Sequence, residues 1–199
     1  MPLRAEDSPS DPYVLFNRWF REARDAGAPQ PDAMTLATAS GDGPSARMVL
    51  FKGFDEAGAF LFYSNYASRK GLDLMADHRA ALVFYWAVTR HQVRVFGVVR
   101  RLGRAASQDY FASRPRGAQL SALASHQSRV VRSREALEKR VGELAARFPQ
   151  EVPLPREWGG YALKPRWLEF WESREDRLHD RLRYVLGNNG RWRVERLAP

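Results

Sequence analysis

The chain of 199 residues is 44% hydrophobic and 12% aromatic, which fits one globular domain with a substantial core and argues against disorder. It contains no cysteine, and this excludes disulfide frameworks, thiolate metal sites and cysteine nucleophiles. Its formal net charge of +9 at pH 7 indicates an anionic partner, either nucleic acid or a small molecule that carries phosphate. The basic residues are scattered as singles and pairs, which favours the small molecule.

The N-terminus and the apolar runs give no sign of export or of a membrane span. The longest apolar run, Ala80–Val88, is far too short to cross a bilayer. Residues 1–13, MPLRAEDSPSDPY, include acidic side chains and lack the apolar centre of a signal peptide. We therefore expect a cytoplasmic protein that does not contact membranes and has a flexible N-terminus over residues 1–10.

The first two thirds of the chain read as a helix, a series of strands and then helices. Apolar residues at helical spacing after Ser10-Asp11-Pro12 predict a helix that ends before Gly27. From Met34 the apolar period changes to two, and turn sequences such as SGDGP separate the strands. Strands are predicted over residues 34–39, 45–54, 59–63, 79–86 and 91–102. Helices are predicted from Ser68 to Met75 and over residues 107–115, 117–125 and 133–148.

The last third returns to strands after a proline-rich break at residues 149–155. The predicted strands cover residues 159–165, 167–173, 181–186 and 191–197. Strands interrupted by a helical insert, without alternation of parallel strands and helices, predict a mainly β fold with peripheral helices (α+β) built around an antiparallel β-barrel. We expect a single domain over residues 1–199.

The sequence lacks the common catalytic signatures and offers anion binding instead. There is no GxGxxG, P-loop, HExxH or GxSxG motif. The four histidines lie far apart in the sequence, so no metal site is predicted. In RMVLFK, Arg47 and Lys52 are five residues apart and would lie on opposite faces of a strand unless a bulge intervenes.

Two pairs of residues have the spacing of a phosphate site. Arg69 and Lys70 follow the predicted helix cap Ser68, and cations at this end of a helix oppose its dipole, which suggests a bound anion. Tyr110 and Arg114 are one helical turn apart, so both can reach one anion. Each pattern alone also occurs on ordinary solvated surfaces.

A row of cations near the C-terminus has the period of a strand. In REDRLHDRLRY, Arg177, His179, Arg181 and Arg183 occupy every second position. Such residues would scatter around a helix but share one face of a strand. We therefore predict a strand that presents cations to an anionic ligand. The alternative is a solvated edge strand whose charges discourage aggregation.

Taken together and in this order, the motifs resemble the pyridoxamine 5′-phosphate oxidase family over residues 11–199. The similar segments are RMVLFK, FYSNYASRKG, RHQVRVFG, YFASRPRGAQ, SHQS, EFW, RLHDRLRY and RLAP. The resemblance implies an FMN-binding split β-barrel, a homodimer, and an FMN-dependent oxidase that converts pyridoxamine and pyridoxine 5′-phosphates to pyridoxal 5′-phosphate. The acceptor would be O2 and the by-product H2O2. The strands of residues 159–199 would contribute to the dimer and to the active site.

The resemblance also assigns roles to individual residues. The FMN contacts would be Arg47, Met48, Val49, Leu50, Phe51, Lys52, Tyr63, Ser64, Arg69, Lys70, Gln92, Gln127, Ser128, Trp171 and Arg181. Arg69 and Lys70 would hold the FMN phosphate. The substrate phosphate would contact Lys52, Tyr110, Arg114 and position 118. Arg177 and His179 would be the catalytic residues that lie over the pyridine ring.

Two features depart from the family pattern. The family usually has a serine where this chain has Ala118, so one hydrogen-bond donor to the substrate phosphate is missing. A hydrogen bond to a charged group contributes about 1.5–3 kcal/mol. The family's basic, tyrosine-bearing N-terminal segment has no counterpart before Asp11. Both departures concern the substrate rather than FMN.

Three alternative functions stay open from the sequence. One is a related split-barrel flavin oxidase of another pathway, such as the phenazine type. Another is a non-catalytic protein that binds FMN or pyridoxal phosphate. The third is a basic nucleic-acid binder, which the scattered charge disfavours and which predicts steep salt dependence of DNA binding.

Overall fold

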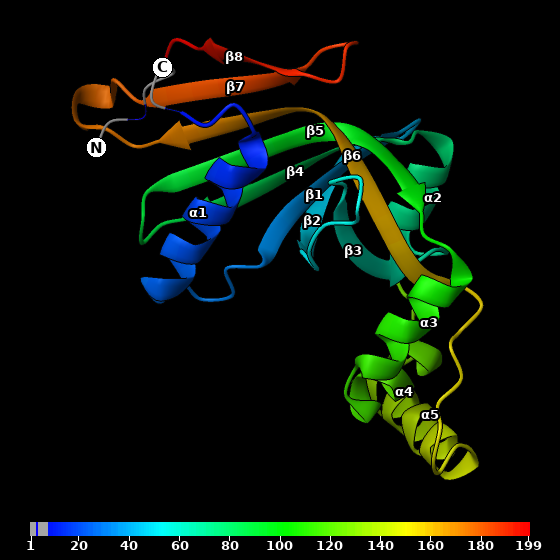
Figure 1. Cartoon of the computed structure of the whole chain (residues 1–199). Helices are drawn as coiled ribbons and strands as arrows, with labels where there is room; N and C mark the ends of the chain where they lie inside the picture. The colour runs from blue at the N-terminus through cyan, green and yellow to red at the C-terminus, as the bar shows by residue number, and fades with distance from the viewer. Residues whose placement is uncertain (1–2, 4–7) are drawn as a thin grey trace.

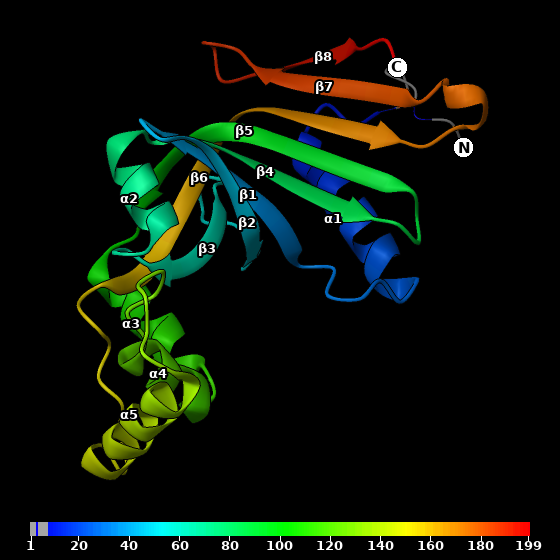
Figure 2. The same ribbon diagram turned by 180° about the vertical axis from the view of Figure 1, so that it is seen from behind.

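Strands of one antiparallel sheet and five α-helices make up the computed structural model, which describes residue 3 and residues 8–199 (Figures 1 and 2). The strands are β1 Ala33–Ser40, β2 Gly43–Leu50, β3 Phe60–Asn65, β4 Arg79–Trp86, β5 His91–Arg101, β6 Trp158–Glu172, β7 Asp180–Leu186 and β8 Trp192–Arg196. The helices are α1 Pro12–Asp25, α2 Arg69–Ala76, α3 Arg104–Ser113, α4 Arg116–Ala124 and α5 Arg134–Arg147. A short 3₁₀ turn covers Glu175–Arg177.

Strand β6 is the longest strand and joins the two halves of the sheet. The strand order is β2-β1-β4-β5-β6-β7-β8, and β3 pairs with β6 outside this path. β6 pairs with β3 over residues 158–163 and with β7 over residues 167–172, and its pairing with β5 shifts register between Phe96 and Gly97. A side chain at Gly97 would clash with the carbonyl oxygen of Lys164. Glycine therefore permits the bulge at which the long strand bends (Figure 1).

Aromatic side chains from α1 and the sheet fill the main core. The ring centroid of Phe16 in α1 lies 5.2 Å from that of Phe60 and 5.1 Å from that of Phe84, and all three rings are fully buried. Edge-to-face rings of this kind stabilise the core beyond the area that they bury. Asp11 caps α1, because its carboxylate accepts a hydrogen bond of 2.9 Å from the Tyr13 N–H. The cap and the rings hold α1 against the sheet.

Helices α3, α4 and α5 form an arm that extends away from the sheet near the start of β6 (Figure 1). The arm has a small core of its own, made by Phe111, Leu120, Val152, Leu154 and Trp158. Tyr63 of β3 packs against this core, so the arm is joined to the sheet at β3. α5 contributes no fully buried side chain.

Apart from the two corrections below and a β2 that ends at Leu50 rather than at residue 54, the predicted helices and strands are present, and the mainly β, antiparallel fold class is confirmed. One correction concerns residues 159–165 and 167–173, which were predicted as two strands and form the single strand β6. Pro165 does not end the strand, because it pairs with Gly97 at the register shift. A flexible N-terminus was expected over residues 1–10, and most of these residues are not among those that the structure describes. No helix among the described residues is long and apolar enough to span a membrane.

The second correction concerns the row of cations near the C-terminus. β7 begins only at Asp180, so the strand predicted through Arg177 and His179 is wrong for these two positions. Asp176 and Arg177 have positive φ angles of 55° and 59° in the 3₁₀ turn, a conformation that a strand does not contain. Of the three cationic residues proposed for the site, only Arg181 lies in β7.

Candidate active site

A cavity of about 990 Å³ is bounded by β2, β3, α2, α3 and α4. This volume lies at the upper end of the range for small-molecule sites. Most of the residues expected at an FMN and substrate site line it, namely Arg47, Met48, Val49, Leu50, Lys52, Tyr63, Ser64, Arg69, Lys70, Tyr110, Arg114, Ala118, Gln127 and Ser128. The expected residues that do not line it are Phe51, Gln92, Trp171, Arg177, His179 and Arg181. Phe51 is buried in the aromatic core instead.

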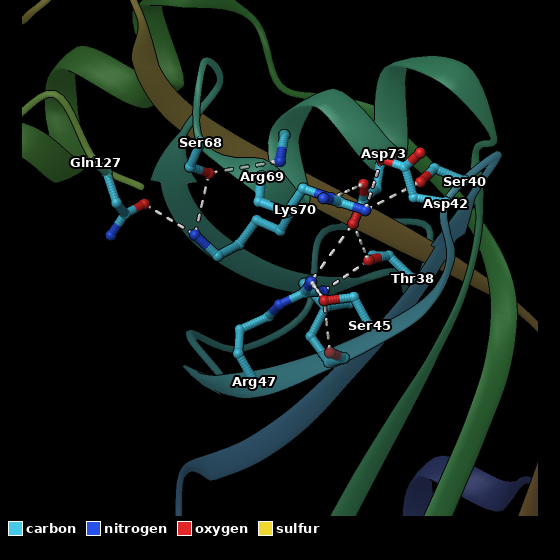
Figure 3. Close-up of polar contacts among 12 residues, drawn as sticks. Thr38, Ser40, Asp42, Ser45, Arg47, Ser68, Arg69, Lys70, Asp73 and Gln127 are labelled. Carbon is cyan, nitrogen blue, oxygen red and sulfur yellow. Dashed lines mark hydrogen bonds and ion pairs between the residues drawn. The ribbon is translucent and has the colours of Figure 1, made fainter. Parts of the chain in front are cut away.

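Two arginines on one side of the cavity share a buried carboxylate, as Figure 3 shows. Asp73 accepts hydrogen bonds from Nε of Arg69 at 2.9 Å, from Nη2 of Arg47 at 3.4 Å and from the Thr38 hydroxyl at 2.7 Å. Burial acts to raise the pKa of Asp73, but the hydrogen bonds from Thr38 and Arg69 outweigh it, and the pKa is lowered. The carboxylate is therefore ionised and holds both guanidinium groups. The spacing of Arg69 and Asp73, one helical turn, is a local signal that could have revealed this pair.

Lys70 is a buried cation beside the two arginines. Its Nζ donates hydrogen bonds to the Ser68 hydroxyl at 3.0 Å and to Oε1 of Gln127 at 2.8 Å (Figure 3). Within the described part of the chain, no ion pair joins Lys70 to a carboxylate. Burial, and then the charge of Arg47, lower the pKa of Lys70 to about 8. Ser68 caps α2, so Lys70 lies in the first turn of the helix, where a bound anion would offset its conflict with the dipole.

Arg114, a further cation in the cavity, is held by aromatic rings. The guanidinium of Arg114 lies 4.8 Å from the ring centroid of Trp158, a cation–π contact. Tyr63 and Tyr110 stack with ring centroids 3.7 Å apart, and the ring of Tyr110 is nearly parallel to that of Trp158. Nη1 of Arg114 is buried and has no hydrogen-bond partner among the described residues. The role of Trp158 could not be predicted from spacing in the sequence, because Trp158 and Arg114 are far apart in the chain.

Lys52 lies in the same cavity as Arg47, although their spacing predicted opposite faces of a strand. The difference arises because β2 ends at Leu50 and the backbone turns at Gly53, where φ is 91°. Lys52 therefore lies beyond the strand. Its Nζ donates a hydrogen bond of 2.9 Å to Oδ2 of Asp32.

Apart from Phe51, the expected residues that do not line the cavity form a second group on β5, β6, β7 and the turn that precedes β7. Gln92, Trp171 and Arg181 are opposite one another in the register of the three strands, and the ring centroids of Trp171 and His179 are 4.7 Å apart. The backbone N–H of Arg174 donates a hydrogen bond of 3.1 Å to Nδ1 of His179. Because this nitrogen accepts, the proton of the neutral ring lies on Nε2, which is left to donate to a ligand.

The two groups lie at opposite ends of β6. Trp158 at the cavity begins this strand and Trp171 of the second group is near its end, which corresponds to about 40 Å along the strand at 3.3 Å per residue. Figures 1 and 2 show the helical arm at one end of the strand and the turn that carries Arg177 at the other. One chain does not bring the two groups together.

Two models of known protein families match the chain, one over residues 20–148 and the other over residues 158–199. Residues 20–148 match the model of pyridoxamine 5′-phosphate oxidase, and residues 158–199 match that of the pyridoxine 5′-phosphate oxidase C-terminal dimerisation region. The chain belongs to the pyridoxamine 5′-phosphate oxidase family. It is therefore an oxidoreductase of an FMN-binding family and carries the dimerisation region of that family.

Curated relatives and solved structures agree with this membership. The pyridoxine/pyridoxamine 5′-phosphate oxidase of Rubrobacter xylanophilus is 53% identical over 199 residues, which cover 99% of this chain and 91% of the relative. That of Cupriavidus pinatubonensis is 51% identical over 198 residues, which cover 99% and 93%. The structure of PhzG from Burkholderia lata 383 in complex with tetrahydrophenazine-1-carboxylic acid superposes with a TM-score of 0.92 at 34% identity, over 99% of this chain and 98% of PhzG. An FMN-binding protein of Nostoc punctiforme, 19% identical with a TM-score of 0.78, shares the fold.

The cavity residues fit FMN. A phosphate group needs cationic donors that are not already neutralised, and Lys70 has hydroxyl and amide partners only. Nη1 of Arg114 is buried without a hydrogen-bond partner among the described residues, so it is available to donate to a second anionic group in the same cavity. The predicted split-barrel fold and FMN as cofactor are thus confirmed at the level of the family.

Proposed function

We propose that the protein oxidises pyridoxamine 5′-phosphate and pyridoxine 5′-phosphate to pyridoxal 5′-phosphate, with O2 as acceptor and H2O2 as by-product. For the amine, water hydrolyses the resulting imine and ammonia is released. The observation that carries the proposal is the presence of two groups of cations on different elements of one cavity. Arg69 and Lys70 lie on α2, whereas Arg114 follows α3 and Lys52 follows β2. Two such groups suit two phosphates, one of a cofactor and one of a substrate.

The FMN phosphate is assigned to Arg69 and Lys70, with Arg47 beside them. The arginine head groups meet at Asp73, whereas the neighbouring Lys70 side chain points toward Gln127 (Figure 3). Residues 47–50 of β2 line the cavity and supply an extended surface along which a flat ring can lie.

The substrate phosphate is assigned to Lys52, Tyr110 and Arg114. Arg114 is pre-oriented by Trp158 and has a free donor, so little side-chain entropy is lost when it binds an anion. Ala118 lines the same cavity but has no donor. Lys52 already donates a hydrogen bond to Asp32. To bind Lys52, the substrate phosphate must either displace Asp32 or bind the lysine together with it.

The second group of residues is assigned to the same active site through a second copy of the chain. Gln92, Trp171, His179 and Arg181 lie at the far end of β6 within one chain, whereas the C-terminal region is one of dimerisation. In a homodimer this region of one protomer would complete the cavity of the other. Arg181 and Trp171 would then contact FMN, and Arg177 and His179 the substrate.

FMN, when bound, would supply the redox chemistry, as acceptor of the hydride from the 4′ carbon of the substrate and as donor of two electrons to O2. The protein binds and orients the two molecules and needs no catalytic triad. His179 is a hydrogen-bond donor through Nε2, because Nδ1 accepts from the Arg174 N–H. Arg177 lies exposed on the 3₁₀ turn and would supply a cation beside the pyridine ring of the substrate.

The decisive experiment is anaerobic reduction of the purified, FMN-loaded protein. Addition of pyridoxamine 5′-phosphate should bleach the flavin absorbance, and admission of air should restore it with formation of one H2O2 per turnover. A protein that binds FMN without being bleached by either phosphate ester would contradict the proposal and indicate a binding protein.

A flavin oxidase of the phenazine type is the second candidate, favoured by the likeness to PhzG and by the missing donor at Ala118. Tetrahydrophenazine-1-carboxylic acid carries no phosphate. Reduction of the flavin by tetrahydrophenazine-1-carboxylic acid, with none by the phosphate esters, would support this candidate instead.

A further inference from the structure

The guanidinium group of Arg181 in β7 is held on two sides before any ligand binds. Its Nε and Nη2 donate hydrogen bonds of 3.0 and 2.8 Å to Oε1 of Glu169. Its Nη1 donates a hydrogen bond of 2.8 Å to the carbonyl oxygen of Ala198. A guanidinium has five N–H donors, so donors remain for an anion after these contacts are made.

Glu169 is itself fixed in place. Its side chain is only 5% exposed, and it lies on β6 between Arg94 of β5 and Arg181 of β7. Oε2 accepts a hydrogen bond of 3.1 Å from Nη1 of Arg94, while Oε1 serves Arg181. The carboxylate therefore has little freedom to rotate. Because Arg181 is hydrogen-bonded to it, the orientation of the guanidinium is restricted as well.

The C-terminal segment, residues 197–198, provides the second restraint. The backbone N–H of Leu197 donates a hydrogen bond of 3.0 Å to the carbonyl oxygen of Arg181. The preceding residue, Arg196, pairs through Nη1 with Asp180 at 2.8 Å. The segment is thus tied to β7, and the Ala198 carbonyl is presented to the guanidinium.

We propose that Glu169 and the C-terminal segment are positioning elements that hold Arg181 in the orientation in which it binds FMN. The inference rests on the assignment of Arg181 to FMN in the proposed function. A free arginine side chain has many rotamers, and fixing them on binding weakens the affinity. In this protein the side chain is fixed when the chain folds, so little further conformational entropy is lost when FMN binds.

The test is FMN affinity, measured on full-length apo-protein by quenching of flavin fluorescence. Glu169→Gln, and separately a chain that ends at Arg196, should each raise the Kd for FMN about tenfold, because the orientation of the guanidinium is lost. In an Arg181→Leu background, Glu169→Gln should cause no further increase, since there is no guanidinium to position. If Glu169→Gln does not fold, the shortened chain, which keeps Glu169, still tests whether a restraint on Arg181 strengthens FMN binding.

A matched control is Glu195→Gln, which removes an ion pair between a neighbouring arginine of β7, Arg183, and Glu195 of β8 and should leave the Kd unchanged. An equal effect of Glu169→Gln with and without Arg181 would show that Glu169 acts only on the stability of the sheet and would overturn the inference. So would a normal Kd in Glu169→Gln when Arg181→Leu binds FMN weakly. A normal Kd in Arg181→Leu itself would instead refute the assignment of Arg181 to FMN.

Discussion

Nζ of Lys52 lies 2.9 Å from Oδ2 of Asp32, so the lysine proposed for the substrate phosphate already has an anionic partner. The contact follows from the β1-β2 hairpin, whose register places Ala33, next to Asp32, opposite Leu50. An incoming phosphate must compete with this carboxylate or share the lysine with it. We therefore predict that Asp32 weakens substrate binding.

Asp32→Asn should lower KM for pyridoxamine 5′-phosphate about two- to fivefold with little change in kcat, the range expected for a partly exposed ion pair. Steady-state kinetics measure this directly. Asp25→Asn, which removes an exposed ion pair with Arg24, is the control and should leave KM unchanged. A raised KM in Asp32→Asn would show that Asp32 positions Lys52 rather than competing for it.

FMN affinity should depend on pH through Lys70. Its pKa is lowered to about 8 by burial and by Arg47, so the lysine of the apo-protein is increasingly neutral above pH 8. A bound phosphate favours the charged form, and binding then takes up a proton. The Kd for FMN should rise about tenfold between pH 7 and pH 9.

Fluorescence titration at the two pH values checks this dependence. Lys70→Arg is the matched variant, because arginine stays charged throughout this range, and its Kd should change far less. An equally steep rise of the Kd in Lys70→Arg would remove Lys70 as the cause.

His91 should make the fold less stable in acid. It stacks on Trp19 with ring centroids 3.9 Å apart and is nearly buried. Burial, and then the charges of Arg18 and other arginines, lower its pKa from 6.5 to about 4, although Glu22 lies 3.9 Å away. Between these pH values the unfolded chain binds a proton that the folded chain does not, so stability falls as the pH falls from about 6.5 to 4.

Between pH 7 and pH 5 the free energy of unfolding should drop by about 2 kcal/mol because of His91. His91→Phe keeps a flat ring against Trp19 and should lose this part of the pH dependence in urea unfolding. His126→Gln, at an exposed position, should retain the slope of the unaltered chain. A slope that is the same in all three proteins would disprove the role of His91.

Arg177→Leu should separate catalysis from cofactor binding. Arg177 lies exposed on the 3₁₀ turn and does not contact the cavity of its own chain. The variant should retain normal FMN content, while kcat/KM falls tens- to several-hundred-fold, about 2–4 kcal/mol at the transition state. Arg177→Lys should restore little, because a point charge lacks the planar group. Loss of FMN with unchanged turnover of the loaded enzyme would contradict the assignment.

Ala118→Ser should strengthen binding of the substrate phosphate. Position 118 lines the cavity on α4, and a new hydroxyl there can donate to the phosphate. KM should fall up to about tenfold with kcat nearly unchanged. Kinetics with pyridoxamine 5′-phosphate test this, and an unchanged or raised KM would remove Ala118 from the account of the substrate site.

Several parts of the site could be predicted from the sequence because they depend on local geometry. Ser68 caps α2 as predicted, and Arg69 and Lys70 lie in its first turn at the cavity. Tyr110 and Arg114 are one turn apart and line the same cavity. Such spacings are set by the helix itself and require no knowledge of distant residues.

The alternation of cations near the C-terminus was a misleading local signal. A period of two predicted a strand, but the backbone at Asp176 and Arg177 adopts positive φ. Arg181 lies in β7, whereas Arg177 and His179 lie on the loop before it. A cation at every second position is therefore compatible with a turn as well as with a strand, and the spacing in the sequence does not distinguish the two.

The sequence by itself determined the succession of helices and strands, the family motifs and the cation pairs with helical spacing. Only the tertiary structure decided that Trp158 supports Arg114, that Glu169 holds Arg181, and that the two groups of residues lie at opposite ends of β6. These relationships join residues far apart in the chain. They depend on strand register and on the bend at Gly97, which arise from packing of the whole sheet and not from the spacing of neighbouring residues.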